Sequence, residues 1–326
     1  MLVSIVIPMR NESEHIRPCL ESILAQDYPA ESIEILVVDG CSTDNSRDVV
    51  MQYFQNNLNL HLLDNPQQIT PTAFNLGIKY ARGQIIILVS AHSVLASDYV
   101  RQCVTALQYS GADGVGGVMH PIGQGYIGKA IALAFGSRFG AGDSKFHYTQ
   151  ENAFVDTIPL PAYRREVFQQ VGLFDETLIR NQDFDFNYRI RQAGGKLFLS
   201  PAIRFYYTPR SSLPALWRQY FQYGRWKVRA LQKHPASLRW RQMVPPVLVS
   251  TLFGSLLLNF FWPPACWLFA LIAGCYLLAN LVASTIAASR CGWRYLPILP
   301  LVFASIHFAW GLGFWYGLML TPFNNK

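Results

Sequence analysis

The segment Ile35-Leu36-Val37-Val38-Asp39-Gly40-Cys41-Ser42-Thr43-Asp44 decides the fold class of this chain. Its apolar half is typical of a buried strand, and it ends abruptly in an acidic turn that contains glycine and serine. A helix-compatible stretch, residues 45–54, follows. Because ligands of open α/β sheets bind where strands end, we expect the Asp39 carboxylate to face a ligand. The alternative for Asp39 alone is a helix-capping turn.

The same strand-then-helix alternation runs through the first half of the chain. Strands are predicted at residues 2–7, 33–38, 60–63, 84–89 and 114–118, and helices at 14–25, 45–54, 72–80 and 97–109. Asp44 and Ser97 are the expected N-caps. This order predicts an α/β domain with a doubly wound, mostly parallel sheet. The opening residues are too short and too poor in basic residues for a signal peptide, so they are interpreted as the first strand.

Charge divides the chain unevenly. Residues 1–185 hold 12 Lys/Arg and all 20 Asp/Glu, whereas residues 186–326 hold 15 Lys/Arg and no acid. A basic second half indicates a membrane-facing or polyanion-facing region. The six cysteines show no paired spacing, which favours a reducing compartment over a zinc or disulfide framework.

Three stretches near the end, residues 244–262, 265–288 and 296–320, contain no charged residue. Each is long enough to cross about 30 Å of hydrocarbon, so three transmembrane helices are predicted rather than a buried helical core. Basic residues precede the first stretch, and Arg290 and Arg294 separate the second from the third. The positive-inside rule then places the α/β domain in the cytoplasm and the C-terminus outside. His307 is expected to bond a neighbouring helix, with a functional role as the alternative.

A basic helix is predicted just before the membrane, at residues 213–231. Arg218, Gln222, Arg225 and Arg229 fall within one narrow stripe at 100° per residue, and aromatic residues flank them. Such a helix suits the surface of an anionic leaflet, which makes membrane lipids an expected partner. The predicted organisation is a domain at 1–210, an interfacial helix and linker at 211–243, and a membrane domain at 244–326.

Two motifs carry a family resemblance. Val6-Ile7-Pro8-Met9-Arg10-Asn11-Glu12 and Val37-Val38-Asp39-Gly40-Cys41-Ser42-Thr43-Asp44-Asn45-Ser46 resemble the nucleotide-binding strands and loops of glycosyltransferase family 2, whose members have a GT-A fold. The resemblance covers roughly residues 1–210 and implies a nucleotide-sugar donor. It places Asp39 at the uracil or ribose and the following residues near the donor: Pro8, Arg10 and Glu12.

The sequence departs from the family where an Asp-x-Asp normally binds a divalent cation, because Ser90-Ala91-His92 stands there. Hard Mg²⁺ or Mn²⁺ prefers carboxylate oxygen, although imidazole can bind Mn²⁺. Ser90 and His92 are therefore kept as donor-binding candidates, and His92 as the candidate metal ligand. The alternative is a loop histidine that binds nothing. The cofactor implied by the resemblance, Mg²⁺ or Mn²⁺, is correspondingly open.

The segment Arg180-Asn181-Gln182-Asp183-Phe184-Asp185 resembles the catalytic Glu-Asp motif of the family, with Arg189 downstream. The resemblance makes Asp183 the base that inverting transfer needs at the acceptor hydroxyl. The alternative is a structural carboxylate at a helix N-terminus, and Asp185 either makes a second polar contact or faces solvent. Gln182 and Arg189 are candidates for acceptor or phosphate contact.

Gln222-Tyr223-Gly224-Arg225-Trp226 fits the Gln-x-x-Arg-Trp pattern of membrane-embedded family members. The resemblance makes Gln222, Arg225 and Trp226 contacts of the nucleotide or acceptor, with membrane anchoring as the alternative. Arg210 is a further phosphate candidate by charge. Three spans are fewer than expected for a polymer-translocating channel, which weakens a processive function.

The chain is therefore expected to be an inverting, membrane-anchored glycosyltransferase of polysaccharide assembly. It would use a nucleotide sugar, with UDP favoured, and a polyprenyl-linked saccharide acceptor at the cytoplasmic face of the membrane. One rival is a polyprenyl-phosphate sugar synthase, in which the lipid phosphate attacks without a base. Another is a binding protein that has lost catalysis. A nucleic-acid partner fits poorly, because the positive charge sits beside the membrane spans.

Overall fold

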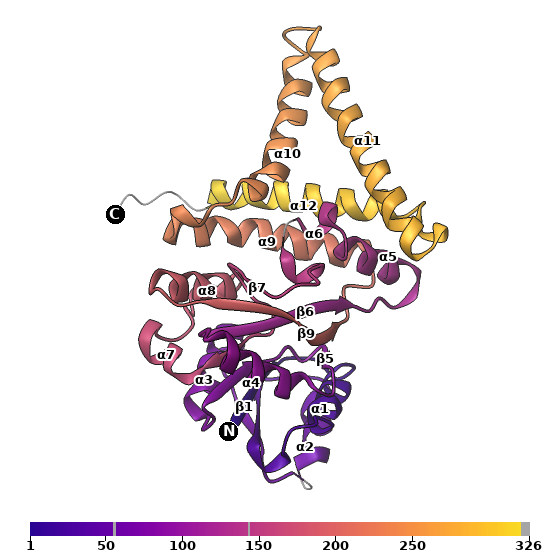
Figure 1. Ribbon diagram of the computed structural model, residues 1–326. Helices are drawn as coiled ribbons and strands as arrows, with labels where there is room; N and C mark the ends of the chain where they lie inside the picture. The colour runs from indigo at the N-terminus through magenta and orange to yellow at the C-terminus, as the bar shows by residue number, and fades with distance from the viewer. Residues whose placement is uncertain (55–56, 143, 321–326) are drawn as a thin grey trace. The chain divides into compact units, whose positions relative to one another are not determined.

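The computed structural model describes residues 1–54, 57–142 and 144–320, which form two compact units (Figure 1). Unit 1 comprises Met1–His120 and Lys145–Tyr207, and unit 2 comprises Pro121–Ser144 and the chain from Thr208 onward. The segment between His120 and Lys145 thus belongs to unit 2, although no sequence pattern separated it from the predicted domain at 1–210. The divisions at residues 210 and 243 stay predictions.

Unit 1 begins with the predicted alternation of strands and helices. Its elements up to residue 121 are β1 (Val3–Met9), α1 (Ile16–Leu24), β2 (Ile33–Asp39), α2 (Ser46–Phe54), β3 (Leu60–Asp64), α3 (Thr70–Tyr80), β4 (Ile85–Leu88), β5 (Ser93–Leu95), α4 (Tyr99–Ser110) and β6 (Gly114–Pro121). β1 and β2 are buried along almost their whole length, as expected for strands that helices cover on both faces. Asp98, one residue beyond the predicted Ser97, precedes α4.

The rest of unit 1 consists of shorter pieces and one long strand. It contains β7 (Ala153–Phe154), β8 (Ala162–Arg164), α7 (Arg165–Val171), α8 (Gln182–Gln192) and β9 (Leu197–Tyr207). The sheet of the described residues has the order β3-β2-β1-β4-β8-β6-β9-β5, and β7 pairs with β9. Parallel pairing joins β3, β2, β1 and β4, while β8 is antiparallel to β4 and to β6. The α/β prediction is confirmed, with the parallel part confined to the first half of unit 1.

An aromatic core packs α8 against β8 and the segment around α7. Phe186, fully buried in α8, stacks on Phe168 and Phe174 at ring-centroid distances of 5.1 and 4.4 Å. The Tyr163 hydroxyl, from β8, donates a hydrogen bond of 2.6 Å to Asn187 Oδ1. Because β8 pairs with β4, these contacts hold the middle of α8 beside a strand that adjoins the parallel part of the sheet.

Unit 2 is helical. Its α-helices are α5 (Gly125–Phe135), α6 (Arg138–Ala141), α9 (Leu213–Lys233), α10 (Trp240–Leu258), α11 (Ala265–Cys291) and α12 (Leu299–Leu320). α10, α11 and α12 are each long and apolar enough to cross a membrane. In Figure 1, α10 and α11 form a hairpin, while α12 lies alongside α9. His307 of α12 meets Tyr276 of α11 at 3.1 Å and the Phe139 carbonyl oxygen at 2.8 Å, so the expected bond to a neighbouring helix is confirmed.

Candidate active site

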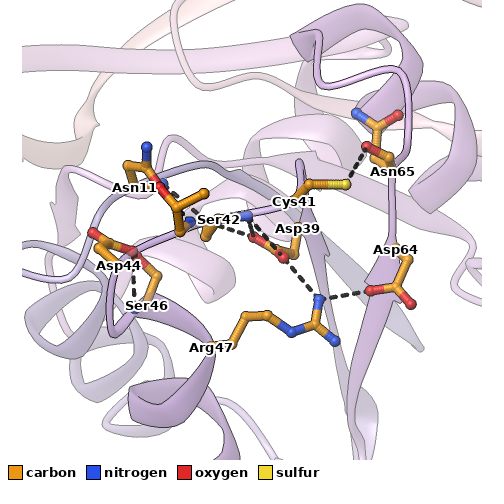
Figure 2. Close-up of polar contacts among 10 residues, drawn as sticks. Asn11, Asp39, Cys41, Ser42, Asp44, Ser46, Arg47, Asp64 and Asn65 are labelled. Carbon is orange, nitrogen blue, oxygen red and sulfur yellow. Dashed lines mark hydrogen bonds and ion pairs between the residues drawn. The ribbon is translucent and has the colours of Figure 1, made fainter.

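The loops that follow β1 and β2 are tied to each other. The Asn11 amide donates to Ser42 Oγ at 2.9 Å, and the Thr43 amide donates to Asn11 Oδ1 at 2.8 Å (Figure 2). Asn11 and Cys41 have φ values of 54° and 55°, in the left-handed region that L-residues other than Asn and Asp rarely adopt. The two motifs that carry the family resemblance therefore form one preorganised edge at the carboxyl ends of adjacent strands.

Asp39 occupies the centre of this edge and is fully buried. Its carboxylate accepts hydrogen bonds from Ser42 Oγ at 2.5 Å and from Arg47 Nη1 at 2.7 Å. The same Arg47 nitrogen lies 2.6 Å from Asp64 Oδ1, so one guanidinium joins the ends of β2 and β3 (Figure 2). A buried carboxylate requires such pairing, because an isolated buried charge is very costly. Asp39 thus serves the turn and also lies where a strand-end ligand would bind.

Asp44 stabilises the start of α2. Its carboxylate accepts hydrogen bonds from the Ser46 amide at 3.0 Å and from the Ser13 amide at 3.1 Å. Burial alone would raise the pKa of Asp44, but these hydrogen bonds and those from the Ser46 and Ser13 side chains lower it to about 2. Asp44 lies two residues before α2 rather than at the predicted N-cap position, but its carboxylate accepts from the Ser46 amide at the helix start and connects the loop after β1 to α2.

Two further donor candidates sit on β1 and just after it. Pro8 is in register with Val38 of β2. Arg10 is exposed, and its guanidinium donates to the Gln68 carbonyl oxygen at 3.4 Å. The Arg10 side chain also lines the space above Gly40, where an added Cβ would lie 3.4 Å from it. Arg10 therefore places an exposed cationic side chain beside the Asp39 turn.

Ser90, His92 and Glu12 come together although 78 or more residues separate Glu12 from the other two. Ser90 Oγ lies 2.9 Å from His92 Nε2, and His92 Nδ1 lies 3.3 Å from Glu12 Oε1. The His92 ring also meets the Tyr207 ring edge-on at a centroid distance of 5.4 Å. These side chains are only partly buried, so they can exchange their contacts for a ligand.

The Glu12–His92 pair decides what cation the site could hold. No group of three His, Cys, Asp or Glu side chains within residues 1–54, 57–142 and 144–320 is arranged to hold a metal ion. One carboxylate and one imidazole form a mixed oxygen and nitrogen donor set, which suits Mn²⁺ better than Mg²⁺. A cation would fit here as a partial site that needs oxygen ligands from a bound diphosphate.

Asp183 lies in the first turn of α8 and is exposed. Asn181, directly before the helix, has a left-handed φ of 63°. Asn181 Nδ2 and Gln182 Oε1 are buried atoms with no hydrogen-bond partner among the described residues. Buried polar atoms are almost always paired, so this helix start has polar groups that a ligand could satisfy.

Arg189 and Asp185 have roles inside unit 1. Asp185 is buried rather than solvent-facing and binds Arg189 Nε at 2.9 Å. The other Arg189 nitrogens donate to the carbonyl oxygens of Val171 and Leu173. The structure therefore shows Arg189 supporting the loop before α8, and a phosphate contact for it stays a prediction.

The remaining candidates belong to unit 2. Gln222 and Arg225 are exposed on α9, as are Arg218 and Arg229, which confirms the predicted polar stripe. The Arg229 guanidinium lies 5.0 Å from the centre of the Trp226 ring. Arg210 is exposed in the segment before α9. Their roles toward a donor or acceptor stay predictions.

Two contacts of the site were absent from the sequence interpretation. Arg47 stands in the first turn of α2, where a cation is unfavourable beside the positive helix end unless an acid compensates it. A basic residue at this position, eight residues after Asp39, could have predicted the ion pair between Arg47 and Asp39. Tyr207 offered none, because its place beside His92 depends on the antiparallel pairing of Ser93 with Tyr207.

Comparison with known proteins gives the site its context. The model of the family described as Glycosyl transferase family 2 matches residues 4–172. The succinoglycan biosynthesis protein ExoA of Rhizobium meliloti (strain 1021) is 30% identical over 319 residues, covering 97% of this chain and 94% of the relative. The chain belongs to glycosyltransferase family 2. It is accordingly a glycosyltransferase, and the family resemblance is confirmed. The donor contacts expected of the two motifs stay predictions.

One further relative in sequence and one solved structure are also similar to this chain. A Methanococcus voltae enzyme, dolichyl N-acetyl-alpha-D-glucosaminyl phosphate 3-beta-D-2,3-diacetamido-2,3-dideoxy-beta-D-glucuronosyltransferase, is 32% identical over 246 residues, covering 73% of this chain and 76% of the relative. Among solved structures, the mannosyltransferase PcManGT from Pyrobaculum calidifontis, in complex with GDP-Man and Mn²⁺, has a TM-score of 0.60 at 19% identity. It is covered to 87%, and this chain to 96%. That likeness confirms the GT-A-like fold.

Proposed function

We propose that this family 2 glycosyltransferase transfers a sugar, with inversion, from a nucleotide sugar to a saccharide carried on a polyprenyl lipid, in polysaccharide assembly. The observation that carries the proposal is the pair of polar groups at neighbouring strand ends. Asp39 and Glu12 sit on preorganised loops at β2 and β1, and Asp183 lies exposed on a helix anchored to β8. The relatives named for succinoglycan biosynthesis and for a dolichyl-linked acceptor support the substrate class.

The donor would bind on the Asp39 edge. The buried carboxylate can accept hydrogen bonds from a base or ribose, and UDP is the first nucleotide to test, followed by the GDP found in the structural neighbour. Arg47 would have to share Asp39 with the nucleotide, since it already binds that carboxylate. Glu12 and His92 would hold a divalent cation that neutralises the charge of the leaving diphosphate.

Asp183 would act as the base at the acceptor. Its carboxylate takes the proton of the acceptor hydroxyl while that oxygen forms the new bond to the anomeric carbon. The bond from that carbon to the diphosphate breaks, and the nucleoside diphosphate leaves with the electron pair. A single carboxylate suffices for this displacement, and inversion follows because attack and departure occur on opposite faces. Gln182 and Asn181, with their unpartnered atoms, would orient the acceptor.

The side of the membrane is also a proposal. Basic residues before α10, together with Arg290 and Arg294 after α11, favour the cytoplasm for both connections. Unit 1 precedes the first of them and would be cytoplasmic. By composition alone the chain has three membrane crossings, and its C-terminus would then lie on the non-cytoplasmic side. Residues 321–326, which form that C-terminus, are not among the residues that the structure describes.

The test is transfer by the purified full chain to lipid-linked acceptors from a panel of UDP- and GDP-sugars, with and without Mn²⁺. The expected product is a lipid-linked saccharide one residue longer, with the anomeric configuration inverted. Transfer to the bare polyprenyl phosphate instead would favour the synthase, in which the phosphate attacks unaided. Absence of turnover with every donor, while nucleotide still binds, would favour a non-catalytic binding protein.

A further inference from the structure

α12 packs along α9 through glycines, and the two helices run in the same direction. A Cβ on Gly313 would come within 2.1 Å of the Phe221 carbonyl oxygen, and one on Gly317 within 2.7 Å of the Arg225 carbonyl oxygen. One turn on each helix separates these contacts, so the approach continues along both (Figure 1). From the α9 side, a Cβ on Gly224 would lie 2.2 Å from the Trp310 carbonyl oxygen. Such backbone-to-backbone packing allows no side chain between the helices.

α9 is too charged to lie across hydrocarbon. It carries Arg218, Arg225, Lys227, Arg229 and Lys233 within 21 residues. A charged residue at the centre of a membrane-spanning helix is strongly unfavourable. Because α12 is held against α9 over its C-terminal half, the two must lie at the same depth. A perpendicular α12 would carry these cations into the bilayer with it.

The outer face of α12 has the composition of a membrane interface. Leu312 is 41% exposed and Met319 is 79% exposed, while Trp315 and Tyr316 are 37% and 42% exposed. Trp and Tyr gather where acyl chains meet head groups. The Arg225 guanidinium lies 5.5 Å from the centre of the Tyr316 ring, so charge and aromatic surface meet at this level. α12 thus presents an apolar side opposite the charged helix that supports it.

The α10–α11 hairpin has the features of true crossing helices. α10 has 19 residues and α11 has 27, which correspond to about 28 and 40 Å at 1.5 Å per residue. The residues at its tip, Phe260, Phe261 and Trp262, are 80%, 88% and 55% exposed. Aromatic residues there suit the far interface of a bilayer about 30 Å thick.

We infer that the chain crosses the membrane twice, by α10 and α11, and that α12 lies in the plane of the cytoplasmic leaflet with its outer face against lipid. α9 supports it from the aqueous side. The C-terminus then lies on the same side as α9, opposite to the side that three crossings would give. Arg290 and Arg294 remain on the cytoplasmic side, as the positive-inside rule requires.

Reporters fused after Lys326 of the full chain test this path. A green fluorescent protein there should be fluorescent, and an alkaline phosphatase there should show activity at least tenfold below that of a periplasmic control. An active phosphatase with a dark fluorescent protein would overturn the inference. An epitope inserted after Trp262 should be reached by antibody from outside intact spheroplasts. If it is reached only after lysis, the hairpin does not cross, which would also overturn the two-crossing path.

A matched pair of substitutions tests depth without a fusion. Leu312 of α12 and Leu281 of α11 are 41% and 53% exposed, and both lie well inside their helices. Leu312→Lys should change the yield of folded membrane protein by less than twofold, because its ammonium can reach the head groups. Leu281→Lys should lower that yield several-fold. Equal losses for both variants would place α12 at the same depth as α11 and overturn the inference.

Discussion

The donor loops and the start of α8 differ in how completely their polar groups are satisfied. Around Asp39 and Asp44, each carboxylate accepts several hydrogen bonds from the neighbouring loops or from Arg47. At α8, the exposed Asp183 accepts a hydrogen bond from the Phe184 amide at 2.8 Å, and the Asn181 and Gln182 side chains each have a buried atom without a hydrogen-bond partner among the described residues. The first region is preorganised to recognise a ligand, whereas at the second the Asn181 and Gln182 amides keep hydrogen-bonding capacity within the described part of the chain. Substitutions in the donor loops should therefore change nucleotide affinity, whereas substitutions at the start of α8 should change the rate of transfer.

The largest effect is expected from Asp183→Asn. Amide in place of carboxylate removes the base, so transfer should fall by about 10² to 10⁴-fold. Donor affinity should change by less than twofold, because the donor contacts lie on the other strand ends. Transfer is measured with labelled donor, and affinity by titration with UDP. Retained turnover in this variant would contradict the base assignment and favour attack by a lipid phosphate.

Asp185→Asn is the matched control for that variant. Asp185 binds Arg189 in the interior, so its loss should lower the melting temperature and leave the transfer of the remaining folded protein largely intact. If Asp185→Asn abolishes transfer at full stability, the catalytic carboxylate is the buried one.

Asp39→Asn should weaken the binding of the nucleotide by about 10- to 100-fold, since a hydrogen bond to a charged group contributes about 1.5 to 3 kcal/mol. The measurement is the Kd of UDP or GDP for the full chain. Asp64→Asn provides the comparison, because Asp64 is 69% exposed and shares the same Arg47 nitrogen. Equal losses in the two variants would mean that Arg47, rather than Asp39, recognises the nucleotide.

The variant His92→Ala tests whether the donor loops include a cation site. If His92 and Glu12 hold a cation with the donor diphosphate, the concentration of Mn²⁺ needed for half-maximal transfer should rise about tenfold. His61→Ala, in β3, should leave it unchanged. A variant with unaltered Mn²⁺ dependence would assign His92 to the loop alone.

The smallest effect concerns acid stability. The pKa of Asp44 is lowered to about 2, below the value near 3.9 of an unfolded chain. Its contribution to the free energy of unfolding is thus complete above about pH 4 and disappears as the pH falls toward 2. Asp44→Asn should lower the melting temperature in detergent at pH 6, and the difference from wild type should shrink below pH 4. Exposed Glu14→Gln should show no such convergence.

Sequence patterns predicted the parts that local physics controls. Apart from β5, the strands and helices up to residue 121 follow from apolar runs, and their ends shift by one to three residues because frayed turns carry little sequence signal. The family resemblance placed Glu12 near the same donor as Asp39, and the parallel pairing of β1 with β2 brings their loops to a common edge. The antiparallel strands β5, β7, β8 and β9 were not predicted, because their pairing joins residues far apart in the chain.

Composition was less informative where depth in a membrane matters. Residues 299–320 are apolar on every side, so their sequence alone is that of a spanning helix. α12 differs from α10 and α11 because the charged helix α9 packs against its glycines. This contact cannot be predicted from the sequence of α12 alone. The pairing of Glu12 with His92 was hidden for the same reason, because it joins two loops of different strands.

The chain passes between the two units three times, near residues 120, 145 and 207, rather than once. A truncation after the last strand would therefore still carry α5, whose Ile131, Ala134 and Phe135 are buried within unit 2. Without the helices that cover them, these side chains would form an exposed apolar patch that promotes aggregation of the fragment. A well-behaved soluble form of the catalytic unit requires a polar linker in place of residues 121–144 as well as removal of the C-terminal helices.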